Sequence, residues 1–264
     1  MARVIAVTNQ KGGVGKTTTC VNLSASLAAT KRRVLLVDMD PQGNATMGSG
    51  IDKNALELSG YDMLTKRAPA SEVIIAAEAS GFDIMPSNGD LTAAEVELMN
   101  EIGREHRLRL ALNTVRDNYD YILIDCPPSL SLLTVNALSA ADTVLIPMQC
   151  EYYALEGLAA LMNTVEQIQE TVNPNLQVEG ILRTMYDPRN SLTLDVSGQL
   201  SEYFGDKVYK AVIPRNVRLA EAPSYGMPAL KYDRVSKGAV AYLALAGEMV
   251  RRHGSQKTST AVAV

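Results

Sequence analysis

Residues 11–18 read Lys11-Gly12-Gly13-Val14-Gly15-Lys16-Thr17-Thr18, between an apolar run at residues 4–8 and a helical pattern at residues 17–29. Glycines allow successive backbone N–H groups to turn inward around phosphate oxygens, and the helix that follows adds the positive end of its dipole. Lys16 is placed to reach the β- and γ-phosphates of a nucleotide, and Thr17 to offer its hydroxyl to Mg²⁺. The pattern therefore predicts a loop that binds a nucleoside triphosphate with all eight residues.

This loop departs from the common phosphate-loop pattern near its start. The pattern G-x-x-x-x-G-K-[ST] begins with glycine, whereas this chain has Gln10 at that position. The loop also carries a second lysine, Lys11, beside it. A glycine-rich turn alone could be structural, but here the strand, the Lys-Thr pair and the helix are all in place. The phosphate-binding interpretation is therefore favoured.

The rest of the chain alternates apolar runs with helical patterns. The runs lack polar alternation, which indicates strands buried on both faces of a parallel sheet. We predict an α/β fold with a mostly parallel twisted sheet and helices on both faces. Strands are predicted at residues 4–8, 33–38, 82–86, 121–125, 143–147 and 177–184, and helices at residues 17–29, 91–116 in two pieces, 153–172, 191–204 and 236–252.

Two acidic segments follow predicted strands, at the sheet edge where such folds bind ligands. The first is residues 38–44, Asp-Met-Asp-Pro-Gln-Gly-Asn, where a carboxylate can position an attacking water, although Pro-Gln-Gly-Asn is also typical of a plain turn. The second is Asp125, which ends the run YILID. A buried strand of this kind delivers a carboxylate to Mg²⁺ or to its water ligands. We expect Thr17, Asp40 and Asp125 to lie nearest the metal.

The segment QKGGVGKTT resembles the deviant Walker A motif of the ParA/MinD family of ATPases. The resemblance extends to LLVDMDPQGNAT, DYILIDCPPSL and residues 147–158. Two further segments, MYDPRNSL and IPRNVRLAEAPSYG, are similar to those of the small chromosomal ParA/Soj subgroup. The resemblance covers nearly the whole chain. It implies a P-loop NTPase fold and a Mg²⁺-dependent ATP hydrolase.

The resemblance also implies roles for single residues. Lys11 would reach across a dimer interface to the phosphates of the partner, much as an arginine finger does, and Asp40 would assist hydrolysis. With Lys16, these two residues are the catalytic candidates. Pro214 and Asn216 would contact adenine, and the acidic position that aligns with Glu151 can touch the partner's nucleotide, although a plain loop would explain the first pair equally well.

A DNA interaction is implied in the same way, through Arg189 and Arg218, which match the positions of arginines that bind DNA without sequence preference in the subgroup. The net charge of −4 argues against nucleic acid, but residues 207–252 hold nine basic and three acidic residues, a balance of +6. A solvated charged face would give the same balance. The family implies an ATP-dependent homodimer, a ParB-type partner that stimulates hydrolysis, and a cytoplasmic place on the nucleoid.

Composition limits the remaining classes. The 264 residues are 47% hydrophobic and 20% charged, which suits one ATPase domain at residues 1–253 with a disordered tail at residues 254–264. Aromatic residues are 5%, which weakens the case for a single-strand binder built on stacked rings. No apolar run is long enough to span a membrane, and the strand-like run at Arg3 leaves no room for a signal peptide. The three cysteines lie in apolar runs and are expected to be buried thiols.

Three other functions were weighed. A membrane-associated MinD-like positioning ATPase needs an amphipathic C-terminal helix, whereas the tail reads GSQKTSTAVAV, with neither a basic face nor a bulky apolar one. An iron–sulfur reductase of the nitrogenase-iron-protein kind needs cluster thiolates at a dimer interface, and Cys126 does not match such a motif. A pure DNA-binding regulator is disfavoured because the phosphate loop begins too near the N-terminus for a preceding helix-turn-helix domain.

Overall fold

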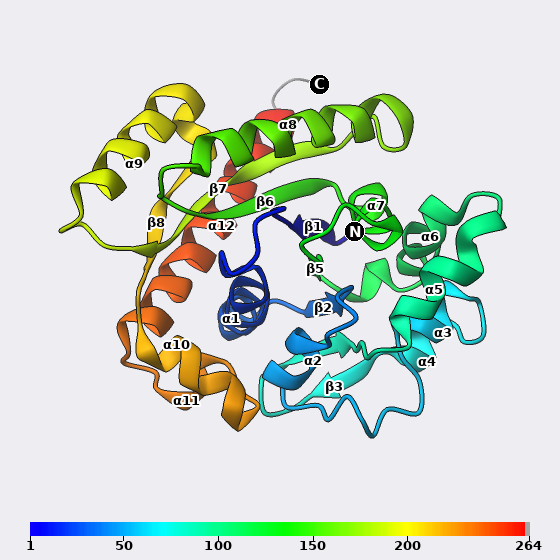
Figure 1. The fold of residues 1–264 in the computed structure, drawn as a ribbon. Helices are drawn as coiled ribbons and strands as arrows, with labels where there is room; N and C mark the ends of the chain where they lie inside the picture. Colours follow the sequence, from blue (N-terminus) through cyan, green and yellow to red (C-terminus); the bar gives the residue numbers. More distant parts are fainter. Residues whose placement is uncertain (262–264) are drawn as a thin grey trace.

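The molecule is built on one twisted sheet with helices on both faces, as the computed structural model in Figure 1 shows. It describes residues 1–261, with side chains for residues 1–254. The strand order is β3-β4-β2-β5-β1-β6-β7-β8, and every neighbouring pair is parallel except β3 with β4. The strands are β1 Arg3–Val7, β2 Val34–Asp38, β3 Ile75–Ala77, β4 Phe82–Met85, β5 Tyr121–Asp125, β6 Thr143–Gln149, β7 Gln177–Tyr186 and β8 Val208–Pro214.

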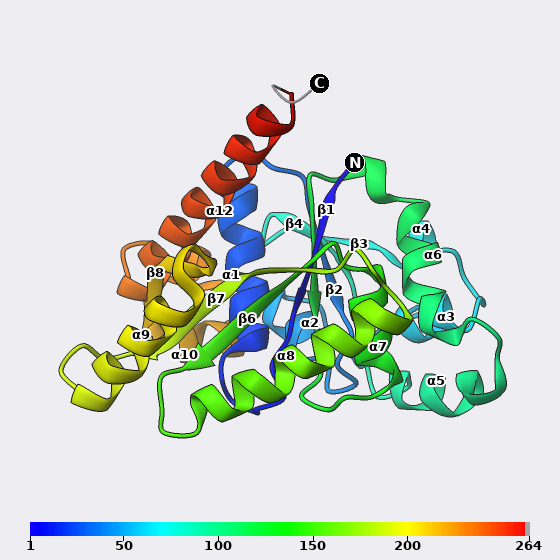
Figure 2. The same ribbon diagram turned by 90° about the horizontal axis from the view of Figure 1, so that it is seen from above.

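The α-helices connect these strands and form the two outer layers. Figure 2 shows α12 running alongside α1, toward the side of the molecule where the N-terminus lies. The helices are α1 Lys16–Ala29, α2 Asn44–Gly48, α3 Gly60–Leu64, α4 Ala70–Val73, α5 Leu91–Glu97, α6 Arg107–Asn113, α7 Leu132–Ala140, α8 Ala154–Thr171, α9 Ser191–Phe204, α10 Val217–Glu221, α11 Ala229–Tyr232 and α12 Lys237–Ala261. None of these helices, within the described residues, is long and apolar enough to cross a membrane.

Alternate residues of the central strands enter two separate cores. In β1, Val4 and Ala6 pack with the α5–α8 layer, whereas Ile5 and Val7 pack with α1 and α12. Side chains of a strand point alternately to the two faces of a sheet, so a strand covered on both faces has to be apolar throughout. The unbroken apolar runs of the sequence have this cause, and the predicted fold class is confirmed.

Several boundaries differ from the predictions. The region at residues 91–116 forms α5 and α6, separated by a loop in which Gly103 has a φ of +68°. The sequence analysis missed β3, β8, α7 and the short helices α2, α3, α4, α10 and α11. The closing helix α12 continues through the segment predicted as a disordered tail as far as Ala261, and residues 262–264 lie outside the described part.

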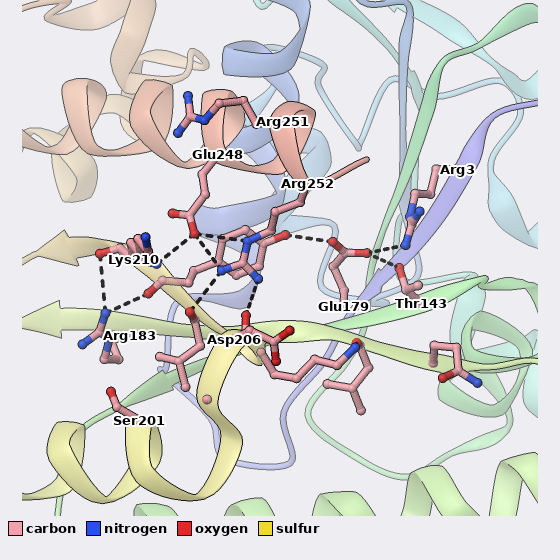
Figure 3. A pocket seen from close by; sticks show the side chains of 16 residues that line it. Arg3, Thr143, Glu179, Arg183, Ser201, Asp206, Lys210, Glu248, Arg251 and Arg252 are labelled. Carbon is pink, nitrogen blue, oxygen red and sulfur yellow. Dashed lines mark hydrogen bonds and ion pairs between the residues drawn. The ribbon is translucent and has the colours of Figure 1, made fainter. Parts of the chain in front are cut away.

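The middle turns of α12 are attached to β8 and to the residues just before it by polar side chains. Glu248 accepts hydrogen bonds from the backbone N–H groups of Lys210 and Ala211, at 3.0 and 2.9 Å. Arg252 donates to the carbonyl oxygens of Asp206 and Val208, at 2.8 and 3.1 Å. A cavity of about 1010 Å³ opens at this edge of the sheet, which Figure 3 shows.

Glu179 on β7 is the centre of this polar cluster. Its carboxylate accepts hydrogen bonds from Tyr209 and His253, each at 2.8 Å. It also accepts from Thr143 at 2.9 Å, and Arg3 lies 3.2 Å away (Figure 3). Burial alone raises the pKa of Glu179, but the bond and charge of His253, the charge of Arg3 and the Tyr209 bond outweigh it and hold this pKa at about 2. The carboxylate is therefore ionised in the folded protein at every pH above that value.

We expect Glu179→Gln to lower the free energy of unfolding at pH 7 by about 3 kcal/mol, the linkage value of a pKa that hydrogen-bond donors and positive charges depress against the effect of burial. A carboxylate whose pKa is lower in the folded than in the unfolded protein stabilises the fold at pH values above its unfolded pKa. That stabilisation is lost as the pH falls to its pKa in the folded protein. The difference between wild type and variant should therefore shrink between about pH 4.5 and pH 2. Urea unfolding at several pH values measures it, with the exposed Glu202→Gln as control. Equal stability of the two proteins at pH 7 would contradict the assignment.

Candidate nucleotide-binding site

The loop after β1 has the backbone of a phosphate cradle. Gly13 and Gly15 have φ of +73° and +88°, the left-handed region that other residues rarely adopt. Gly15 precedes α1, and no side chain among the described residues caps that end of the helix. The first N–H groups of α1 are therefore available to an anion. Val14 is buried, and its carbonyl accepts a hydrogen bond from Thr184 of β7 at 2.8 Å.

Lys16 lies inside the loop. Its side chain is buried, and Nζ donates to the carbonyl oxygen of Lys11 at 3.2 Å. Burial lowers the pKa of Lys16, and the negative charge of Asp125 opposes that effect. A buried ammonium group with a single backbone acceptor is well suited to receive phosphate oxygens. Thr17 and Thr18 follow in the first turn of α1, as predicted from the motif.

Lys11 lies at the rim of the same loop and points away from it. Its Nζ is 2.6 Å from the carboxylate of Glu151, and the two side chains are 48% and 43% exposed. Gln10, the residue that departs from the common pattern, donates to the hydroxyl of Thr164 on α8 at 3.1 Å. Asn9 donates to the carbonyl of Pro147 at 2.8 Å. The first half of the loop is thus attached to β6 and α8.

Two carboxylates are buried side by side beneath the loop. Asp38 and Asp125 end the neighbouring strands β2 and β5 in matching register, and both are fully buried. Burial raises the pKa of both carboxyl groups, and repulsion by Asp38 raises that of Asp125 further, while hydrogen bonds from Thr17 and Cys20 lower it. Among the described residues, Asp125 Oδ2 has no hydrogen-bond partner.

These groups fit a hard divalent cation. Mg²⁺ prefers carboxylate, hydroxyl and water oxygens, and Thr17 and Asp125 are already joined by a hydrogen bond. An ion would supply a partner for the orphaned Asp125 oxygen and offset the charge of the pair. Asp40 is close enough for its charge to act on Lys16 and on Asp125. The three predicted metal-site residues are therefore brought together.

The segment that carries Asp40 is held by a closed ring of hydrogen bonds. Asp38 accepts from the N–H of Asp40 at 3.1 Å, and from the N–H and the hydroxyl of Thr46 at 2.8 and 2.7 Å. The Thr46 hydroxyl accepts from the N–H of Ser87 at 2.9 Å. The Ser87 hydroxyl donates to the carbonyl of Asp40 at 2.8 Å. The sequence analysis missed Thr46 and Ser87: Thr46 ends the quoted stretch LLVDMDPQGNAT, and no motif includes Ser87.

The residues predicted to contact adenine lie at the same edge of the sheet. Pro214 ends β8, and Asn216 precedes α10. The Oδ1 atom of Asn216 is buried and has no hydrogen-bond partner within the described residues. A side-chain amide in this position can accept a hydrogen bond from an exocyclic amino group of a base. The geometry is compatible with the predicted role.

The predicted DNA-binding arginines are exposed but ion-paired. Arg189 is 88% exposed and donates to both oxygens of Asp187, at 2.9 and 2.8 Å. Arg218 lies 2.7 Å from Glu221 and 3.3 Å from Asp233. The sequence analysis did not foresee these acidic partners. Exposed ion pairs of this kind contribute little to stability. Each arginine can therefore exchange its acidic partner for a phosphate group at a small cost in free energy.

The three cysteines are buried and free, as expected. Burial raises the pKa of each thiol, so Cys20, Cys126 and Cys150 are protonated near neutral pH. No cluster of three or more His, Cys, Asp or Glu side chains suited to a metal ion occurs among the described residues.

Comparison with known proteins identifies relatives along the whole chain. The AAA domain family matches residues 2–178. An uncharacterized protein of Pseudomonas putida is 66% identical over 96% of both chains. The sporulation initiation inhibitor protein Soj of Bacillus subtilis is 56% identical over 94% of this chain and 98% of its own. The chromosome partitioning protein ParA of Caulobacter vibrioides is 50% identical over 98% of both chains.

Solved structures share the fold. Cobyrinic acid a,c-diamide synthase from Mycobacterium smegmatis, with bound ATP analog and magnesium, is 37% identical over 97% of both chains, with a TM-score of 0.85. The septum site-determining protein MinD of Pyrococcus horikoshii, complexed with Mg-ADP, is 26% identical over 96% of this chain and 98% of its own, with a TM-score of 0.78.

We expect Lys16→Ala to abolish nucleotide binding, because it removes the buried cation of the cradle. The affinity for a nucleoside triphosphate should fall by at least about a hundredfold, the weight of two charge-assisted hydrogen bonds. Calorimetric titration measures it, and circular dichroism verifies the fold. The matched control is Lys207→Ala, a lysine at the opposite edge of the sheet. Normal affinity in Lys16→Ala would show that the phosphates bind elsewhere.

Proposed function

The chain belongs to the ParA/Soj-type P-loop ATPases of chromosome partition, and we propose that it acts as an ATP-dependent dimer that binds DNA without sequence preference and releases it after hydrolysis. The main support for this proposal is that the two lysines of the loop differ in burial. Lys16 is buried among groups that suit phosphate and metal. Lys11 is half exposed on the rim, where a second molecule can meet it.

Hydrolysis follows from the residues of the cradle. The N–H groups of residues 12–18 and the Lys16 ammonium would bind the phosphates of ATP, and Thr17 and Asp125 would hold Mg²⁺. Asp40 lies close enough for its charge to act on Asp125. The metal supplies positive charge to the phosphate oxygens as charge develops in the transition state. Asp40 orients a water for in-line attack on the γ-phosphate and accepts a hydrogen bond from it. Pro214 and Asn216 position the base.

Dimerisation places Lys11 of each subunit near the phosphates of the other. Two nucleotides buried face to face carry a large negative charge, and a lysine donated by the partner offsets it. In the single chain Lys11 is bound to Glu151, and a half-exposed pair of this kind is weak enough to separate. Glu151 is then free to meet the partner's nucleotide. We assign the whole unit, residues 1–253, to one ATPase domain, because α12 spans from β8 to α1.

The DNA surface is assigned to the loops after β7 and β8. Arg215 is exposed, and its charge helps the Arg189 bonds to lower the pKa of Asp187, so Arg189 and Arg215 lie near each other. Arg218 follows on α10. A dimer offers twice as many arginine contacts to the DNA phosphates as one subunit. Once the first subunit is bound, the contacts of the second form at high effective concentration, so binding would need the ATP-bound dimer. The proposed partner that stimulates hydrolysis is a ParB-type protein. The proposed location is the nucleoid in the cytoplasm.

Two other activities receive less support. The chain is 37% identical to the cobyrinic acid a,c-diamide synthase, compared with 50% to the chromosome partitioning protein ParA of Caulobacter vibrioides and 56% to Soj of Bacillus subtilis. A membrane-binding, MinD-like role depends on the tail, and the side chains of residues 255–264 lie outside the described part of the structure. The absence of a membrane-binding face there therefore stays a prediction.

We expect Lys11→Ala to bind ATP as a monomer, because Lys16 and the glycine cradle remain, and to fail in dimerisation and hydrolysis. Light scattering with ATP and Mg²⁺ measures dimerisation: the molar mass of the wild type should double, and that of the variant should not. Lys207→Ala, which removes a lysine at the opposite edge of the sheet, serves as the control and should still dimerise and hydrolyse ATP. A dimer of wild-type affinity in Lys11→Ala would refute the role in the partner's site.

Arg189→Ala and Arg218→Ala should each weaken DNA binding about equally on unrelated duplexes, because phosphate contacts position without specifying sequence. Binding should need ATP rather than ADP, and log K should fall with log salt by about 0.9 per phosphate neutralised. A salt titration on two duplexes tests both points. The control is Arg32→Ala, an exposed arginine before β2 at the opposite edge of the sheet. Strong preference for one duplex, or equal binding with ADP, would count against the proposal.

A further inference from the structure

The residue proposed to orient the attacking water has both of its backbone polar groups held by side chains. The N–H of Asp40 donates to Asp38, and its carbonyl accepts from Ser87, 47 residues further along the chain. The Asp40 carboxylate itself accepts the N–H of Gln42 at 2.9 Å, within its own turn. The two side chains that fix the backbone of Asp40 therefore come from the ends of different strands, β2 and β4.

Thr46 completes the connection between these two side chains. Its hydroxyl donates to Asp38 Oδ2 and accepts from the N–H of Ser87, so one oxygen links β2 to the residue after Pro86. Asp38, Thr46 and Ser87 are each fully buried. Water cannot replace a lost bond in such a place without rearrangement, so each hydroxyl has to be satisfied inside the ring. The Asp40 turn is thereby confined to one geometry.

We propose that Thr46 and Ser87 are positioning residues for ATP hydrolysis that fix the backbone of Asp40, Thr46 through Asp38 and Ser87 directly. The proposal rests on the proposed role of Asp40. An orienting carboxylate has to be held within about half an ångström of its productive place, and such accuracy comes from the groups that support it. Neither Thr46 nor Ser87 touches the phosphate cradle in this arrangement, so nucleotide binding does not depend on them.

The test is single-turnover hydrolysis of γ-labelled ATP with Mg²⁺, combined with calorimetric ATP affinity. Thr46→Val has nearly the same shape but breaks both side-chain links of the ring. We expect its hydrolysis rate to fall roughly tenfold, the effect of one lost buried hydrogen bond expressed in the transition state, with ATP affinity within about twofold. Thr46→Ser restores the hydroxyl and should recover most of the rate. Ser87→Ala removes only the bond to the Asp40 carbonyl and should give a smaller loss.

A matched control separates positioning from loss of stability. Thr143 is a buried threonine that donates to a buried carboxylate, Glu179, at the other end of the sheet. Thr143→Val makes the same chemical change as Thr46→Val and should lower the melting temperature without changing the hydrolysis rate. If Thr143→Val slows hydrolysis as much as Thr46→Val does, the effect is general destabilisation and the proposal is wrong.

Asp40→Ala is measured in parallel, because it tests the premise. If Asp40→Ala hydrolyses ATP at the wild-type rate, the proposed role of Asp40 fails and the inference fails with it. If Asp40→Ala is slow while Thr46→Val and Ser87→Ala are as fast as wild type, only the positioning role is overturned. Should Thr46→Val not fold, Ser87→Ala decides between these outcomes, since it removes a single bond.

Discussion

The pair of buried carboxylates at the ends of β2 and β5 is the constraint on which the site depends. Asp38 and Asp125 lie opposite each other in the register of the two strands, with no exposed surface. Ionised groups in such a place repel each other and lack water, so the surrounding chain has to supply positive charge and hydrogen-bond donors. Thr46 donates to Asp38, Cys20 donates to Asp125, and Lys16 supplies a nearby positive charge. The arrangement leaves one oxygen of Asp125 unsatisfied, and a divalent cation is the natural complement.

The same pair divides the site into two parts with different partners. Asp125 faces the phosphate loop through Thr17 and Cys20, whereas Asp38 faces the Asp40 turn through Thr46. The residues proposed to bind the metal and those proposed to position Asp40 therefore lie on neighbouring strands but in separate hydrogen-bond systems. The front of the loop adds a third connection, through Gln10 to α8. A glycine at the position of Gln10 would lack the side chain for that bond, which gives a physical reason for the departure from the common loop pattern.

Much of the fold could be predicted because the strands are buried on both faces. The run at residues 121–125 and the helix at residues 191–204 have the predicted bounds. By contrast, β8 has register shifts against β7 and carries the exposed Lys210, so it shows no continuous apolar run. The apolar run at residues 73–77 is short, and only its last three residues form β3. Apolar periodicity reports burial, and strands that are half exposed or irregular give a weak signal.

The predictable part of the candidate site consists of residues that are close together in the sequence. The phosphate loop, Asp40 and Asp125 follow from motifs, and the structure brings them together, while their roles stay predictions. Ser87 and Thr184 come from distant strands and carry no motif. The acidic partners of Arg189 and Arg218 were equally unforeseen, since only the folded chain shows which charges pair.

The attachment of α12 to β8 has a consequence for association. An edge strand with free N–H and C=O groups is a template for pairing with another chain, and proteins that stay soluble cover or shorten such edges. Here Glu248 occupies two N–H groups of β8 and Arg252 occupies the carbonyls of Asp206 and Val208, beside the start of that strand. The opposite edge, β3, is three residues long and antiparallel. Sheet continuation between copies is thus disfavoured at both edges of the described sheet, which agrees with the proposed dimer contact through side chains at the rim of the phosphate loop. Contacts of that kind can separate again when the charge between them changes, whereas a shared sheet could not.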